Sequence, residues 1–228
     1  VRRAPTGRAA LVERTALADD GAMQTPADPV IAAAPAAANP ACVVNCAVYG
    51  PDGRKQNILL DDISEVLAVD DGSFVWIGLY EPAAEVLAQL QEEFCLHDLA
   101  IEDAGKAHQR PKIEAYGDSL FIVANTAQAI DERIAYGETH IFLGARYLVT
   151  VRHGASLSYA PARQRIEREP ELMAMGAPAA LYAVLDAIVD NYLPIVDDFK
   201  TTLNALEQDI ISEQFHRGIV IRLYQLKR

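Results

Sequence analysis

The sequence has few cysteines and no long apolar run, and both shortages exclude classes of protein. Its 228 residues include three cysteines, Cys42, Cys46 and Cys95. A sparse, odd set of this kind is typical of free thiols in a reducing compartment rather than of a disulfide framework. The spacing of Cys42 and Cys46 matches no zinc pattern, and no second ligand pair follows. Because no run of 18 or more uninterrupted apolar residues occurs, we expect no segment of this chain to span a bilayer.

Basic charge is also scarce. The chain has 32 acidic and 20 basic residues, which gives a formal net charge of −12. A protein that binds duplex nucleic acid needs a basic surface, so this balance argues against that class and favours cations or basic surfaces as partners. Apolar residues make up 51% of the chain, which is enough to build a sizeable core.

Signatures of catalysis are absent from the sequence. It contains no Walker loop, no GxGxxG after a strand, no GxSxG and no HExxH. The five histidines do not pair at the spacing of metal ligands on a helix, and we interpret them as surface or core residues: His97, His108, His140, His153 and His216. We therefore expect a protein that is not an enzyme.

Composition divides the chain into three zones. Residues 1–41 are rich in Ala and Pro and lack periodicity, which predicts a flexible tail. Residues 42–170 are predicted to form an α/β domain, and residues 171–228 a helical region. The tail carries four basic and four acidic residues, so the whole net charge lies on the remainder.

Strands and helices alternate in the second zone. The sequence predicts strands at 43–49, 74–79 and 119–124, and a hairpin of 138–143 and 147–151 around the turn 144–146. It predicts helices at 61–67, from Pro82 through Phe94, and at 97–104. We expect Trp76 to lie in the core or partly buried at a sheet edge. The alternation predicts the α/β class with a mixed sheet.

A helix of some 35 residues is predicted after Gly176. Apolar residues recur there in steps of three and four, in a near-heptad pattern. Pro194 predicts a kink and Gly218 a second break near the end. Asp186, Asp190 and Asp197 fall roughly on one side of this helix. Their repulsion requires water, a basic side chain from a neighbour or a divalent cation, so the alternatives are a solvated face and a metal-binding face.

Two further charged motifs lie at the end of the predicted helix at 97–104 and in the segment before the next strand. Glu102 and Asp103 could cap the helix, pair with Lys106 or Arg110, or face a partner subunit. Arg110 precedes Pro111 and must therefore be extended. We expect this segment to end a helix and start a strand, with Arg110 or Lys112 pairing a carboxylate.

Five segments together resemble a known family. They are FVWIGL at 74–79 with Pro82 and Glu85 after it, FCLHDLAIED at 94–103, HQRPKIEAY at 108–116, LFIV at 120–123, and DAIVDNY at 186–192. In this order and spacing they resemble the cytosolic domain of the CorA family of magnesium and cobalt transporters, over roughly residues 43–228.

The resemblance implies an architecture larger than this chain. The family has an αβα sandwich that leads into a long stalk helix and then two transmembrane helices, and five protomers surround a central pore. The Gly-Met-Asn loop that follows the first membrane helix in the family does not occur here. The resemblance therefore implies a fragment without the pore, on the cytoplasmic side of the inner (plasma) membrane.

The resemblance also implies a regulatory metal site. In the family, carboxylates at subunit interfaces bind Mg²⁺ and hold the pore closed. The matching positions here are Asp103, Glu102 and Asp186, and Asp190 lies close enough to Asp186 in the sequence to be an alternative to it. The principal stalk partner of Asp103 in the family would lie after Arg228. Mg²⁺, or Co²⁺ or another divalent cation, is the expected ligand. Two alternatives remain: the zinc-transporting sister branch of the same superfamily, and an α/β interaction module with no metal role.

Overall fold

The computed structural model describes residues 38–130, 133–211 and 217–227. Most of the predicted tail, residues 1–37, lies outside the described residues. The described part contains a seven-stranded sheet in the order β2-β1-β3-β7-β6-β5-β4. The strands are β1 (Val43–Tyr49), β2 (Lys55–Asn57), β3 (Phe74–Tyr80), β4 (Lys112–Tyr116), β5 (Ser119–Ile130), β6 (Arg133–Gly144) and β7 (Tyr147–Gly154). Strands β3 and β7 are parallel and all other neighbours are antiparallel, so the sheet is mixed, as predicted.

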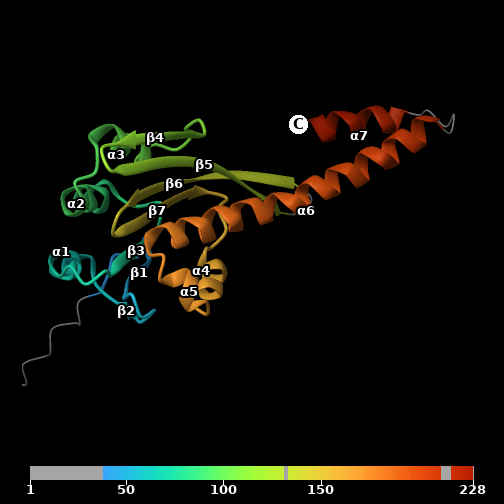
Figure 1. The fold of residues 1–228 in the computed structure, drawn as a ribbon. Helices are drawn as coiled ribbons and strands as arrows, with labels where there is room; N and C mark the ends of the chain where they lie inside the picture. Colours follow the sequence, from blue (N-terminus) through green and yellow to red (C-terminus); the bar gives the residue numbers. More distant parts are fainter. Residues whose placement is uncertain (1–37, 131–132, 212–216, 228) are drawn as a thin grey trace, which may run out of the picture. The chain divides into compact units, whose positions relative to one another are not determined.

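Helices cover both faces of the sheet, which makes an αβα sandwich (Figure 1). One apolar cluster joins the sheet to α1 (Ile63–Ala68), α2 (Ala84–Phe94) and α3 (Asp98–Ala104), with the short helix η1 (Leu60–Asp62) beside them. A second cluster joins the other face to α4 (Ala160–Ile166), α5 (Pro170–Met173) and α6 (Ala177–Ile211). Trp76, 2% exposed, lies in the second cluster and so in the core, as expected.

Helix α2 shows how the apolar spacing of the sequence becomes packing. Val86, Leu87, Leu90 and Phe94 are all buried, because their spacing places them on one side of the helix. The helix ends at Cys95, which has left-handed backbone angles (φ 52°, ψ 44°) and whose N–H bonds back to the carbonyl of Gln91. This turn brings the chain directly into α3.

Helix α6 has the length that the sequence predicts, 35 residues. Its first turns present Ala177, Ala180 and Ala183, all fully buried, so that the helix lies close against the sheet. Further along, Phe199 is 37% exposed and Leu203 is 44% exposed. The predicted apolar stripe therefore covers the sheet only in its first half.

The last described helix, α7 (Arg217–Lys227), corrects the sequence prediction for the end of the chain. A second helix begins near the end, as predicted, but the boundary lies before Gly218: α6 ends at Ile211, and Gly218 is the second residue of α7. Helix α7 contacts α6, and Arg222 donates to Asp209 at 3.0 Å. Leu206 of α6 and Ile219 of α7 are both buried. Two helices in contact can bury apolar side chains that one continuous exposed helix would leave in water.

Among the described residues, α6 is the one helix that is long and apolar enough to cross a membrane by length and composition. Of its most apolar stretch, 28% is buried. The sequence expectation of no spanning segment was based on uninterrupted apolar runs, and acidic residues interrupt α6. Core helices of soluble proteins meet the same criterion.

Candidate metal-binding carboxylates

Asp103 lies in the last turn of α3, and the start of that helix is held against β4. The Nδ1 atom of His97 accepts the N–H of Leu99 at 3.2 Å and so caps the helix. The ring of His97 also stacks on Tyr116 of β4, with 4.1 Å between ring centroids. Ala104, fully buried, anchors the end of the helix in the core.

The carboxylate of Asp103 is paired with a lysine from β4. Lys112 Nζ donates to Asp103 Oδ2 at 2.7 Å and to Glu114 Oε2 at 2.8 Å. Tyr116 Oη donates to the same Glu114 oxygen at 2.9 Å. Residues 112, 114 and 116 meet in this way because alternate side chains of a strand point to one face. Hydrogen bonds to Asp103 and Glu114 raise the pKa of Lys112, and those from Lys112 and Tyr116 lower the pKa of Glu114.

Glu102 has a separate partner on its own helix. Its Oε1 lies 2.5 Å from Lys106 Nζ, four residues along the chain. This contact is one of the alternatives that the sequence offered. The hydrogen bond to Glu102 raises the pKa of Lys106, but both side chains are more than half exposed, so the pair contributes little to stability.

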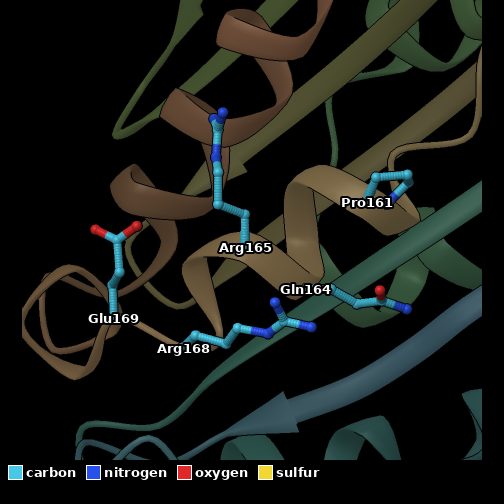
Figure 2. A pocket seen from close by; sticks show the side chains of 5 residues that line it. All are labelled: Pro161, Gln164, Arg165, Arg168 and Glu169. Carbon is cyan, nitrogen blue, oxygen red and sulfur yellow. The ribbon is translucent and has the colours of Figure 1, made fainter.

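Asp186, on α6, is also paired with a basic residue. Arg165 reaches from α4 toward α6, whereas Arg168 of the same surface hollow extends in another direction (Figure 2). Its Nη2 donates to Asp186 Oδ2. Asp186, and to a smaller extent the exposed Asp190 one turn later, raise the pKa of Arg165. The repulsion predicted on this helix is thus offset by a basic side chain from a neighbouring helix.

The sheet separates the two pairs of candidate carboxylates within one chain. Glu102 and Asp103 belong to α3, which packs on one face, and Asp186 and Asp190 belong to α6, which packs on the other. Among residues 38–130, 133–211 and 217–227, no group of three or more His, Cys, Asp or Glu side chains is arranged to hold a metal ion. The donor oxygens are of the kind that Mg²⁺ prefers. A site with three or more protein ligands would therefore need further ligands from another chain or from residues outside the described ones.

The sequence did not predict a set of polar side chains on β6 and β7 that contact the end of α3 and the loop after it. Glu138, 4% exposed, accepts the backbone N–H of His108 at 2.6 Å and of Gln109 at 2.9 Å. His140 is fully buried, with Nε2 3.4 Å from Glu138 Oε1, and burial lowers its pKa to about 4. His153 Nε2 lies 2.9 Å from the carbonyl oxygen of Ala104. These contacts fix the loop that joins α3 to β4, and so fix Asp103 relative to Lys112.

A signal for this group was present in the sequence. Glu138, His140 and Phe142 alternate with Thr139 and Ile141 on one predicted strand. Since both sets are buried in the structure, the strand carries a carboxylate and an imidazole at core positions. Buried ionisable groups on a central strand are uncommon. Here Glu138 accepts two backbone N–H groups, whereas neither ring nitrogen of His140 has a hydrogen-bond partner among the described residues.

Comparison with known proteins identifies the family. The profile of the CorA-like Mg²⁺ transporter protein family matches residues 71–228. This chain belongs to that family. The resemblance inferred from the motifs is thus confirmed, and the family is one of membrane proteins that transport divalent cations.

Individual relatives of this CorA-like chain are also named as metal ion transporters. It is 30% identical over 138 residues to YfjQ of Bacillus subtilis, named as a metal ion transporter, and that match covers 60% of this chain and 43% of the relative. It is 27% identical over 174 residues to the cobalt/magnesium transport protein CorA of Thermotoga maritima, covering 73% of this chain and 49% of the relative. The match thus spans less than half the length of each relative.

A solved structure shares the fold. The soluble domain of CorA from Methanocaldococcus jannaschii aligns with a TM-score of 0.56 and 20% identity, over 78% of this chain and 69% of that one. The αβα sandwich with a mixed sheet and a long C-terminal helix is therefore the architecture of a CorA soluble domain, as the sequence predicted.

Proposed function

We propose that this chain is the metal-sensing, gating domain of a divalent cation transporter for Mg²⁺ or Co²⁺. In the proposal the domain lies on the cytoplasmic side of the membrane and works in a homopentamer. Mg²⁺ bound between subunits favours the closed state, and the domain acts by binding rather than by catalysis. The observation that carries the proposal is the placement of Glu102 and Asp103 on one face of the sheet and of Asp186 and Asp190 on the other. One copy can thereby present one pair to the opposite pair of the next copy.

The charge of the chain supplies the driving force for such a sensor. A formal net charge of −12 on each copy makes neighbouring subunits repel one another. A divalent cation between subunits relieves this repulsion only where the two carboxylate faces meet, so it favours the state in which they meet. Mg²⁺ keeps much of its water and binds weakly through one or two carboxylates, which suits a sensor of millimolar concentrations.

The proposal is tested on the full-length protein in proteoliposomes. Cation uptake is measured against internal Mg²⁺ for the wild type, for Asp103→Ala, and for Asp118→Ala as a control in the exposed turn between β4 and β5. We expect Asp103→Ala to need about tenfold more Mg²⁺ for inhibition, a change of about 1.4 kcal/mol in binding free energy. Asp118→Ala should behave like the wild type. An unchanged Mg²⁺ dependence in Asp103→Ala would remove Asp103 from the proposed site.

The same liposomes test the choice of cation. Uptake of Mg²⁺ and Co²⁺ in preference to Zn²⁺ is the expected result. Preferential uptake of Zn²⁺ would instead place the protein with the zinc-transporting branch.

A further inference from the structure

Lys112 donates a hydrogen bond to Asp103, the carboxylate to which the proposed function assigns Mg²⁺. We infer that Lys112 is an internal competitor that sets the affinity of Asp103 for divalent cations. The inference rests on the proposed function, in which Asp103 binds Mg²⁺. It concerns a residue that is neither a carboxylate nor a metal ligand.

The geometry around Lys112 is that of a cation site filled by an ammonium group. Asp103 Oδ2 and Glu114 Oε2 converge on Nζ from two elements, at 2.7 and 2.8 Å. Tyr116 fixes the Glu114 oxygen through its hydroxyl, and the ring of Phe121 lies 5.6 Å from Nζ. Two carboxylate oxygens that face one point are the first ligands of a hard divalent ion. The ammonium and such an ion cannot occupy that point together, so metal binding to both oxygens must displace Lys112.

Lys112 is held more firmly than Lys106, the other lysine beside the candidate carboxylates. Its side chain is 29% exposed and contacts two carboxylates, whereas Lys106 is 63% exposed and contacts Glu102 alone. Water screens the exposed pair, so Lys106 is a weak competitor for a metal ion. The Lys112 ammonium is held by two charge-assisted hydrogen bonds. Its removal should therefore change metal binding much more than removal of Lys106.

The direction of the effect follows from charge. With Lys112 in place, an incoming divalent ion must break two hydrogen bonds to carboxylates and meets a positive charge. Without the ammonium, Asp103 and Glu114 become two neighbouring carboxylates with no counter-ion from Lys112, and a divalent ion then stabilises them. Neutral variants of Lys112 should thus bind metal more tightly than the wild type.

The test measures Mn²⁺ binding to the 228-residue chain by the loss of the free-ion signal in electron paramagnetic resonance. Mn²⁺ serves as the probe because it takes the same oxygen ligands as Mg²⁺. Lys112→Met should lower the dissociation constant about tenfold relative to the wild type. Lys112→Arg, which keeps the charge, and Lys106→Met, the matched control, should both stay within about twofold of it. In the double variant Lys112→Met, Asp103→Asn the tighter Mn²⁺ binding should disappear.

Folding is checked separately by circular dichroism. Lys112 begins β4, an edge strand, so its neutral variants are expected to fold, and Lys112→Gln serves as a second neutral variant. If both folded neutral variants bind Mn²⁺ no more tightly than the wild type, the inference is wrong. A gain that persists in the double variant would also overturn it, because the added ion would then not be on Asp103. These outcomes are distinct from failure of the proposed function, which is judged by Mg²⁺ inhibition of transport in Asp103→Ala.

Discussion

At the scale of single residues, burial of His140 makes stability depend on pH. Its pKa is about 4 in the folded chain, mainly because burial disfavours the charged ring, against an ordinary value of 6.5. Glu138 on β6 raises this pKa, His153 on β7 lowers it, and Asp103 on α3 raises it. Between pH 6.5 and 4 the unfolded chain binds more protons at this site than the folded chain does. The contribution of neutral His140 is therefore complete above pH 6.5 and is lost as the pH falls toward 4.

We expect His140→Leu to flatten this part of the pH profile. The wild type should lose on the order of 3 kcal/mol more unfolding free energy between pH 7 and 4 than the variant does, as measured by urea denaturation at each pH. His108→Asn is the matched control, because His108 is exposed and its positive φ of 74° suits asparagine. Its profile should follow that of the wild type. Parallel profiles for the wild type and His140→Leu would show that His140 does not cause this pH dependence.

The ion pairs show how far sequence alone reaches at this scale. The contact of Glu102 with Lys106 was predictable, because residues four apart on a helix are neighbours. The contact of Asp103 with Lys112 was foreseen only as a lysine that pairs some carboxylate. Arg165 and Asp186 are 21 residues apart on two helices, and nothing local fixes that distance. Such pairs depend on how the helices pack.

At the scale of elements, the end of α2 offers a test of backbone strain. Cys95 has left-handed backbone angles that glycine adopts at no steric cost, and its side chain is exposed. Cys95→Gly should therefore stabilise the fold by about 0.5–1 kcal/mol, a rise of roughly 1–4 °C in Tm by calorimetry. Cys95→Ala removes the thiol but keeps the strain, so it should not raise Tm. An equal rise in both variants would show that the thiol, and not the backbone, is responsible.

Elements with a strong period were predictable, and weakly patterned ones were not. The spacing of Val86, Leu87, Leu90 and Phe94 predicted α2, and the steps of three and four after Gly176 predicted α6. The outer halves of β5 and β6 were missed because residues 125–137 carry few large apolar side chains. Their strand structure comes from pairing with each other in one long hairpin. The strand order, with β3 beside β7, is set by contacts between distant segments that no local pattern contains.

At the scale of the whole molecule, the net charge predicts how copies respond to divalent ions. With 32 acidic and 20 basic residues, each copy repels the next, and the two candidate carboxylate pairs lie on opposite faces of the sheet. Monovalent salt weakens this repulsion by screening over a Debye length of about 10 Å at 0.1 M. A divalent ion that binds carboxylates of two copies at once also adds a direct link between them.

We therefore expect millimolar MgCl₂ to shift the chain toward larger assemblies in analytical ultracentrifugation, beyond the effect of NaCl at equal ionic strength. Asp103→Asn and Asp186→Asn should each reduce the part of this shift that MgCl₂ causes beyond NaCl, because each removes a carboxylate from one of the two faces. Asp118→Asn should not. If NaCl and MgCl₂ act alike at equal ionic strength, contacts between copies respond to screening alone, and bridging by a divalent ion is excluded for this chain.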